Sequence, residues 1–236
     1  MIKLAVSGAC GKMGSRIIAL ALKEPDFELV AALEAGTHSQ IGKLIQGVKI
    51  SKNCDEIKNA DCLIEFSNPA ATLEHLSCAL KYRKPIVIGT TGLNDEDKAK
   101  IKEAAGKIPI VFSPNMSIAV NLLFKLVKEA SQRLSGDYKA DIIEAHHVHK
   151  KDAPSGTAKR LADIIKAASA REVRAIKSIR EGEIVGDHRV VFESAVDKIE
   201  LYHSAKTRDI FAKGALAAAR FIVKKGPGLY DMQDLF

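Results

Sequence analysis

Hydrophobic and polar positions follow a regular pattern along the first half of the chain. Short apolar runs, typical of buried strands, are interspersed with longer stretches that carry apolar residues at helical spacing. The expected strands span residues 2–7, 27–33, 61–67, 85–90 and 108–113, and the expected helices span 12–23, 70–82 and 95–105. Strands and helices in this order build a parallel sheet with helices on both faces, so the pattern predicts a Rossmann-like α/β domain.

The pattern changes after residue 118. Two helices are expected at 119–134 and from residue 156 onward, and four more strands at 141–147, 173–180, 188–194 and 198–204. Because the later strands follow one another closely, they favour a mixed or antiparallel sheet.

The last expected helix, residues 211–225, is rich in small residues, and we expect it to pack back on the first domain. Residues 1–117 and 207–236 are therefore predicted to form one domain. Residues 118–206 are predicted to form a second, α+β domain inserted into it.

A glycine-rich turn, GACGKMG at residues 8–14, directly follows the first expected strand. Its spacing is G-x-x-G-x-x-G rather than G-x-G-x-x-G, so the turn alone does not distinguish a nucleotide site from a simple turn. Glu34 ends the second expected strand, 20 residues after Gly14 (34 − 14 = 20), where a carboxylate holds the adenosine ribose hydroxyls. Strand, turn, helix, strand and carboxylate in this order favour a dinucleotide-binding domain.

The residue after Glu34 bears on the choice of cofactor. Proteins that bind the 2′-phosphate of NADPH usually place an arginine near this carboxylate, and here the next residue is Ala35. We therefore predict that NADH serves at least as well as NADPH.

Composition narrows the function further. The chain has 236 residues, 47% of them hydrophobic, with no run long enough to span a bilayer and no room for a signal peptide before the first strand, which predicts a cytoplasmic protein. The four cysteines form no C-x-x-C pair and are expected to be reduced thiols. The net charge of +7 is spread along the chain and aromatic residues are few, so the charge suits a small anionic substrate and an anionic cofactor as well as it suits nucleic acid. The predicted partner is a small dicarboxylate, with no nucleic acid and no membrane.

The segment EAHHVHKKDAPSGTA, residues 144–158, carries the most chemistry. Its three histidines, His146, His147 and His149, permit a metal site, but consecutive strand residues point to opposite faces and no metal is predicted. A polar strand end is the second interpretation. The third is an anion-binding acid–base site, in which Lys150 and the amides of a helix capped by Ser155 hold a small dianion and a side chain supplies a proton.

Seven segments in order resemble the 4-hydroxy-tetrahydrodipicolinate reductases, also called dihydrodipicolinate reductases. They are GACGKMG, IEFSNP, GTTG, SPNMSIAVN, EAHHVHKKDAPSGTA, REGEIVGDH (180–188) and HSAKTRDIFAKGAL (203–216). The resemblance covers nearly the whole chain and implies an enzyme of lysine and diaminopimelate biosynthesis. It implies hydride transfer from NADH or NADPH to C4 of the cyclic substrate, protonation at C3, and a homotetramer. The second domain would then bind the substrate and carry the oligomer contacts.

The resemblance also implies residue roles. His146 and Lys150 are the candidate catalytic acids, and the substrate carboxylates are bound by His147, Lys150, Gly156 and Thr157. The implied cofactor-binding residues are Gly8, Ala9, Cys10, Gly11, Lys12, Met13, Gly14, Glu34, Gly89, Thr90, Thr91, Ser113, Asn115 and Met116. Segments near Ser117 and Thr207 are expected to act as hinges.

Two alternatives are weighed against this assignment. A different imine or aldehyde-acid reductase, such as an aspartate-dehydrogenase-like enzyme, would share the cofactor domain but lack HHVHKKDAPSGTA. A non-catalytic NAD-binding regulator would have no need of His146 and Lys150.

Overall fold

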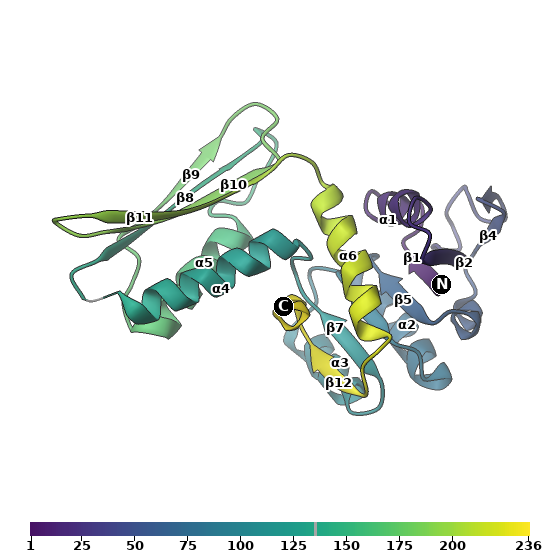
Figure 1. The fold of residues 1–236 in the computed structure, drawn as a ribbon. Coiled ribbons are helices and arrows are strands. Elements are labelled where there is room, and N and C mark those ends of the chain that lie inside the picture. Colours follow the sequence, from purple (N-terminus) through teal and green to yellow (C-terminus); the bar gives the residue numbers. More distant parts are fainter. Residues whose placement is uncertain (135) are drawn as a thin grey trace. The chain divides into compact units, whose positions relative to one another are not determined.

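The computed structural model describes residues 1–134 and 136–236 and divides them into two compact units (Figure 1). The first unit comprises Met1–Ser117 and Asp209–Phe236, and the second comprises Ile118–Arg208. The sequence analysis places the two boundaries between residues 117 and 118 and between residues 206 and 207, and the two units meet between 117 and 118 and between 208 and 209. The roles expected of the two parts remain predictions.

The first unit contains an eight-stranded sheet in the order β12-β7-β6-β5-β1-β2-β4-β3. The strands are β1 (Ile2–Ser7), β2 (Phe27–Leu33), β3 (Leu44–Ile45), β4 (Val48–Ser51), β5 (Cys62–Glu65), β6 (Ile86–Ile88), β7 (Pro109–Phe112) and β12 (Gly228–Tyr230). The helices are α1 (Gly14–Ala21), α2 (Pro69–Tyr82), α3 (Asp95–Ala105) and α6 (Asp209–Ile222), with 3-10 turns η1 (Cys54–Asn59) and η2 (Met232–Leu235). All strand pairs are parallel except β3–β4, which confirms the predicted Rossmann-like sheet.

Both faces of this sheet are buried. In β1, Leu4 and Val6 belong to the apolar cluster that contains α1 and α6, whereas Ala5 between them belongs to the cluster that contains α2 and α3. Successive strand residues point to opposite faces, so an uninterrupted apolar strand needs helices on both sides. Because the strands are parallel, the carboxyl ends of β1, β2, β5, β6 and β7 lie along one edge, where α/β proteins bind ligands.

Helix α6 packs on the first unit, as predicted, although it follows the second unit in the sequence (Figure 1). Its buried residues are mostly small. A Cβ atom on Gly214 would lie 1.7 Å from the backbone oxygen of Met116, so only glycine allows this close approach.

The sequence patterns missed the short strands β3, β4 and β12. Strands β3 and β4 form a hairpin whose two loop residues, Gln46 and Gly47, both have positive φ (50° and 81°). A two-residue loop of this kind matches the twist of antiparallel strands, but strands of two to four residues are too short to show a period.

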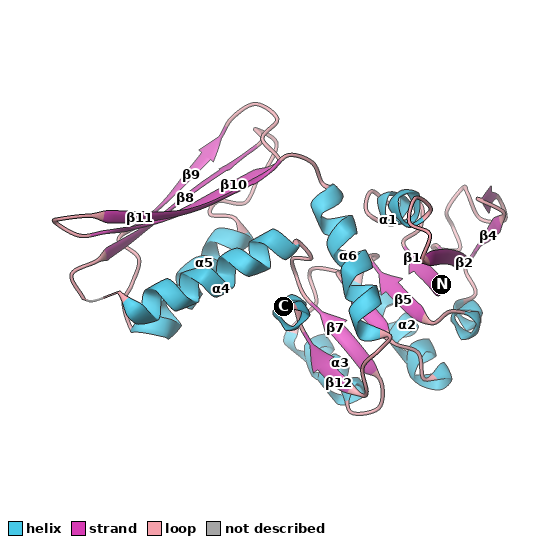
Figure 2. Cartoon of the chain, in the orientation of Figure 1, coloured by secondary structure: helices cyan, strands magenta, loops and turns pink. Residues whose placement is uncertain are grey.

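The second unit is a four-stranded sheet covered on one face by two helices, as Figure 2 shows. The strands are β8 (Lys139–His146), β9 (Ala175–Arg180), β10 (Gly186–Glu193) and β11 (Lys198–Ala205), in the order β11-β10-β8-β9. The helices are α4 (Ile118–Arg133) and α5 (Gly156–Ser169). The β8–β9 pair is parallel and the other two pairs are antiparallel, which confirms the predicted mixed sheet.

The two faces of this sheet differ. Ile142, Val190 and Phe192 point to the helices, and the strand register places Ile143 and Tyr202 on the opposite face. Among the described residues of the second unit, no helix covers that opposite face.

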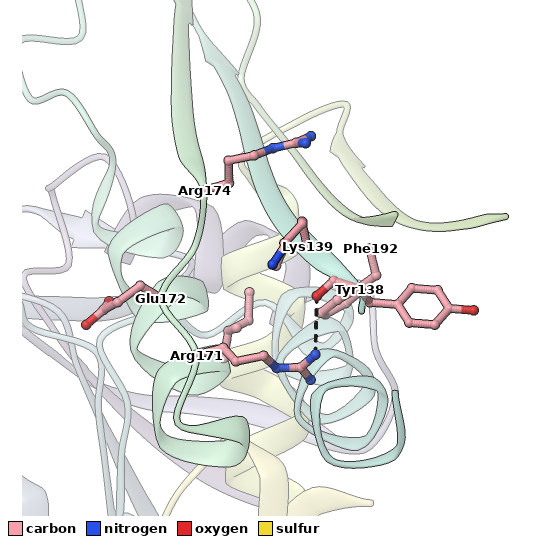
Figure 3. A pocket seen from close by; sticks show the side chains of 8 residues that line it. Tyr138, Lys139, Arg171, Glu172, Arg174 and Phe192 are labelled. Carbon is pink, nitrogen blue, oxygen red and sulfur yellow. Dashed lines mark hydrogen bonds between the residues drawn. The ribbon is translucent and has the colours of Figure 1, made fainter. Parts of the chain in front are cut away.

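The connection from α5 to β9, residues 170–174, is short, and Arg171 anchors it. The Arg171 guanidinium donates hydrogen bonds to the backbone oxygens of Ser131 (2.9 Å), Leu134 (3.0 Å) and Tyr138 (3.2 Å), the last drawn in Figure 3. The first two carbonyls lie at the C-terminal end of α4, where a cation is favourable. A cavity of about 230 Å³ lies beside these groups, at the end of β8 opposite His146.

The cysteines correct one expectation. The structure pairs Cys54 with Cys78 in a disulfide, and only Cys10 and Cys62 are free thiols. The two cysteines lie in η1 and α2 and are 24 residues apart, so their spacing alone did not indicate the pairing. In the parts of the chain that the structure describes, no helix is long and apolar enough to cross a bilayer.

Candidate functional site

The glycine turn follows β1 at the ligand-binding edge of the first sheet. Gly8 has a positive φ of 69°, and a Cβ atom there would lie 2.3 Å from the backbone oxygen of Phe66. A Cβ atom on Gly14 would lie 2.1 Å from the backbone oxygen of Gly8. Both positions therefore require glycine. Helix α1 begins at Gly14 without a side-chain cap, so its first turn presents backbone amides of the kind that bind phosphates.

Glu34 is anchored at the end of β2, beside this turn. Its Oε2 accepts a hydrogen bond from the Cys10 amide (3.0 Å), and its Oε1 accepts one from the Ala35 amide (2.9 Å). A carboxylate has about four acceptor positions, so both oxygens can also accept hydroxyl donors. This is the geometry that a ribose-binding carboxylate needs.

A cavity of about 270 Å³ opens at Gly8 and Glu34. It is lined by Ser7, Gly8, Glu34, Ala35, Gly36, Lys52, Ser67, Asn68, Ala71, Glu74 and His75. The cradle that only glycine fits, the anchored carboxylate and this cavity together suit the adenosine half of a dinucleotide.

Three other predicted residues of the turn have different surroundings. Ala9 is fully buried and offers only its backbone, and Lys12 is exposed. Met13, also predicted to bind the cofactor, packs its side chain against the core.

The remaining predicted cofactor residues follow β6 and β7 at the same edge of the sheet, outside the lining of this cavity. A Cβ atom on Gly89 would lie 2.1 Å from the Phe66 ring, so Gly89 makes room for that ring. Thr91 is exposed, whereas Thr90 is buried and its Oγ1 accepts a hydrogen bond from the Ser67 amide (3.2 Å).

In the β7 segment, the Ser113 hydroxyl donates to the Asn115 backbone oxygen (2.9 Å), and the Met116 side chain is buried in the core. The predicted cofactor-binding residues are thus spread along the carboxyl edge of the sheet. The side chain of Met116 contributes to the hydrophobic core.

Sequence reasoning missed a buried polar network at the base of the cavity. Glu65, at the end of β5, is fully buried, and its Oε2 lies 2.7 Å from His75 Nδ1. Ser7 Oγ lies 3.0 Å from the same nitrogen. Since Ser7 and His75 also line the cavity, this network fixes its floor.

The predicted acid–base segment lies at the end of β8 in the second unit. Glu144 is fully buried, and its Oε2 pairs with His146 Nδ1. Burial alone would raise the pKa of Glu144, but hydrogen bonds, above all from Arg180, hold the pKa below its ordinary value. Burial lowers the pKa of His146, against the opposing effect of Glu144. A carboxylate at Nδ1 orients the imidazole and leaves its Nε2 for chemistry.

Arg180, the last residue of β9, connects Glu144 to the following loop. Its Nη2 lies 2.9 Å from Glu144 Oε1, and its Nε donates to the Lys150 backbone oxygen (3.3 Å). The Ser155 amide also donates to Glu144 Oε1 (3.3 Å). Ser155 is the N-cap of α5, as predicted, since its side chain accepts from the Ala158 amide. One buried carboxylate therefore holds the histidine, the loop and the helix start together.

The predicted anion-binding residues surround this helix start. Lys150 Nζ is paired with both carboxylate oxygens of Asp152 (2.6 and 2.8 Å). Gly156 and Thr157 form the first turn of α5, where backbone amides favour an anion. His147 is half-buried, and its Nδ1 has no hydrogen-bond partner among the described residues.

The three histidines of the segment lie in different surroundings. His146 is paired with Glu144, and His149 is exposed beside Glu183 (3.9 Å). In the described residues, potential ligand atoms that lie within 4.8 Å of one another occur elsewhere, at Cys10, Glu34 and His38, and at Asp55 with Cys54 and Cys78, whose sulfurs are joined in the disulfide.

Two family models together match almost the whole chain. The model described as dihydrodipicolinate reductase, N-terminus, matches residues 2–116, and the model described as dihydrodipicolinate reductase, C-terminus, matches residues 119–236. The chain belongs to the dihydrodipicolinate reductase family. Membership in this family of oxidoreductases confirms the resemblance, and it favours a reductase over an aspartate-dehydrogenase-like enzyme or a non-catalytic regulator.

Individual relatives agree over their full lengths. The chain is 43% identical to the 4-hydroxy-tetrahydrodipicolinate reductase of Methanosarcina barkeri, covering 100% of the chain and 99% of the relative. It is 40% identical to that of Syntrophotalea carbinolica, covering 100% and 98%. The dipicolinate-bound dihydrodipicolinate reductase of Paenisporosarcina sp. TG-14 superposes with a TM-score of 0.84 over the whole of both chains at 23% identity, which shows a shared fold. The N-terminal half of this family member is thus a nucleotide-binding fold consistent with NAD(P)H.

The segment REGEIVGDH contributes two residues to which sequence reasoning gave no role. Arg180 begins it and His188 ends it, and both lie at the site of this family member. The parallel register pairs His146 with Arg180, and the antiparallel register pairs Glu144 with His188. The signal was present in the segment, but only the strand pairing shows which of its side chains reach the site.

His188 makes the stability of this family member sensitive to acid. It is 4% exposed, its Nε2 lies 3.3 Å from Ser155 Oγ, and its Nδ1 has no partner among the described residues. Burial, with the nearby His146 and His203, lowers the pKa of His188 to about 4. As the pH falls, His188 is therefore protonated in the unfolded chain at a higher pH than in the folded protein. The free energy of unfolding decreases as the pH drops from about 6.5 toward 4.

We expect His188 to account for a loss of about 1–2 kcal/mol in unfolding free energy between pH 7 and pH 5. Urea denaturation at both pH values should show a smaller loss in His188→Gln, whose amide can still reach Ser155. An equal loss in the two proteins would show that His188 does not titrate in this way.

Proposed function

We propose that this chain reduces 4-hydroxy-tetrahydrodipicolinate (dihydrodipicolinate) to tetrahydrodipicolinate with NADH or NADPH, in lysine and diaminopimelate biosynthesis in the cytoplasm. Besides family membership, one observation carries the proposal. The buried Glu144–His146 pair is linked through Arg180 and Ser155 to Lys150 and to the start of α5. A proton donor and an anion cradle are thus built into one unit, as reduction of a small dicarboxylate requires.

The first unit supplies the cofactor site in this proposal. The glycine turn and the first turn of α1 bind the pyrophosphate, and the Glu34 carboxylate accepts hydrogen bonds from the ribose hydroxyls. When bound, the reduced nicotinamide supplies a hydride, which the substrate accepts at C4.

His146 supplies the proton at C3. With its Nδ1 held by Glu144, proton donation takes place from Nε2, and this requires the imidazolium form. Burial disfavours that form in the free protein. A bound dianion adds negative charge beside His146, which favours protonation, so substrate binding itself prepares the acid. A Cβ atom on Gly186 would lie 3.1 Å from His146 Nε2, so glycine at this position leaves room around the reacting nitrogen.

Lys150 binds a substrate carboxylate. Its ammonium is paired with Asp152 in the structure, and Asp152 is half-exposed. A substrate carboxylate can therefore replace Asp152 on Lys150, while the amides of Gly156 and Thr157 and the side chain of His147 hold the second carboxylate. Asp152 keeps the lysine extended before substrate arrives.

A coupled assay tests the proposed reaction. The purified protein, supplied with the synthase that makes the substrate, should oxidise NADH or NADPH at a rate that depends on the synthase product. Absorbance of the reduced cofactor gives the rate. Cofactor oxidation that is absent, or independent of the synthase product, would contradict the proposal.

The same assay tests the cofactor preference. We expect kcat/KM with NADH to be at least equal to that with NADPH, because Ala35 stands where an arginine would favour the 2′-phosphate. A hundredfold preference for NADPH would contradict this expectation.

We also propose that the chain acts as a homotetramer with hinges near Ser117 and Thr207. The helix-free face of the second unit's sheet, which includes Ile143 and a Tyr202 that is 54% exposed, supports a subunit contact there. Sedimentation equilibrium measures the oligomeric state.

Crystal structures of the free protein and of the protein with cofactor and substrate bound test the hinges. Identical interdomain geometry in both structures would exclude the hinges.

A further inference from the structure

The cavity beside Glu34 contains a lysine that the sequence pattern did not connect with it. Lys52 follows β4, 18 residues after Glu34 (52 − 34 = 18), and it lines the cavity together with Ala35 and Gly36. The parallel register pairs Leu33 with Ser51, and the Glu34 amide donates to the Ser51 backbone oxygen (2.9 Å). The sheet therefore places Lys52 next to the ribose-binding carboxylate.

The stem of Lys52 lies across Gly36. A Cβ atom on Gly36 would lie 3.0 Å from Lys52 Cδ and 3.7 Å from its Cβ. These distances put the aliphatic stem against the bare backbone of residue 36, so the absence of a side chain there allows the lysine to lie along the cavity wall. In the described parts of the chain, no hydrogen bond or ion pair is found for Lys52 Nζ, and the residue is exposed.

The other charged groups of the cavity would repel a phosphate. Glu34 and Glu74 line it, and Glu65 is buried at its base against His75. A ribose hydroxyl can donate to Glu34, but a 2′-phosphate has no proton for this carboxylate and carries like charge. Among the described residues that line the cavity, Lys52 is the only lysine or arginine.

We infer that Lys52 is a specificity-determining residue that binds the 2′-phosphate of NADPH, in place of the arginine that position 35 lacks. The inference rests on the proposed cofactor site. Its ammonium offsets the repulsion from Glu34, so that the chain accepts both cofactors. An ammonium on a flexible stem binds phosphate as a point charge and can turn to water when NADH is bound, whereas a planar arginine is suited to bidentate phosphate binding.

Equilibrium titration of the full chain with NADPH and with NADH, followed by cofactor fluorescence without substrate, tests this role. In Lys52→Ala, we expect the ratio of Kd for NADPH to Kd for NADH to rise about tenfold, since one hydrogen bond to a charged group is lost. Lys52→Glu should raise the ratio further. Gly36→Ala should raise it in the same direction, because the added methyl group displaces the lysine stem.

Lys49→Ala is the matched control, since Lys49 is an exposed lysine of β4, the strand that precedes Lys52, and does not line the cavity. Its ratio should equal that of the unaltered chain. A ratio unchanged in Lys52→Ala, or changed equally in Lys49→Ala, would overturn the role of Lys52 while leaving the proposed function intact. Failure of the unaltered chain to bind either cofactor would overturn both.

Discussion

Replacing His146 with alanine is expected to lower kcat by about 10²–10⁴-fold, the usual contribution of a positioned general acid. Steady-state rates in the coupled assay measure this change. The expectation follows from the buried pairing of His146 Nδ1 with Glu144, which leaves Nε2 as the proton-donating atom of the proposed mechanism. Lys150→Ala is expected to lower turnover within the same range and also to raise KM, because in the proposed mechanism Lys150 holds a substrate carboxylate.

His149→Ala and Lys151→Ala are the controls for these variants. Both residues are exposed neighbours in the same segment and have no part in the proposed mechanism. Their kinetic constants should match those of the unaltered protein. Unchanged turnover in both His146→Ala and Lys150→Ala would remove the two residues from the mechanism.

Glu144→Gln is expected to lower the free energy of unfolding by about 3–5 kcal/mol, because it leaves Arg180 without its buried counter-charge. Urea denaturation measures this loss. The activity should fall as well, since an amide does not stabilise the protonated form of His146. Adding Arg180→Met should recover part of the lost stability, since it removes the uncompensated charge.

The pH dependence gives an independent check on Glu144. Its pKa in the folded state lies below its ordinary value, so its contribution to stability is complete above that ordinary value and is lost as the pH falls through the folded-state pKa. The Gln variant lacks this contribution, and its stability should fall less steeply with acidification. Parallel acid profiles for the two proteins, or an additive double variant, would contradict the proposed ion pair.

Much of the first unit was predictable from periodicity. A strand such as β2 matches its predicted bounds because six of its seven residues, all but Glu28, are apolar and stand between polar segments. The sequence located the turn through Gly8 and Gly14, two positions where only glycine fits, although their spacing alone did not distinguish a nucleotide site from a simple turn. The cofactor-binding role of Glu34 stays a prediction. Strand β12 was missed, because a three-residue strand is determined by its partner β7 and not by its own composition.

In the second unit, the candidate acid was predictable, but the groups that hold it were not. His146 and Lys150 stand in a segment of unusual composition, whereas Arg180 lies 34 residues beyond His146 (180 − 146 = 34). The ion pair between Arg180 and Glu144 depends on the parallel pairing of β8 and β9, which local sequence does not reveal. The disulfide between Cys54 and Cys78 was missed for the same reason, since it depends on how η1 packs on α2.

The hydrogen bond from the Ser155 amide to Glu144 has a consequence for attempts to alter substrate preference. Substitutions that reshape the first turn of α5 to admit a different acid would also shift the carboxylate that orients His146. In the proposed mechanism, substrate affinity and reaction rate therefore change together, because Glu144 accepts from the Ser155 amide through Oε1 and pairs with His146 through Oε2. Variants designed for a different substrate should therefore change the half-exposed Asp152 and its neighbours first and leave the first turn of α5 unchanged.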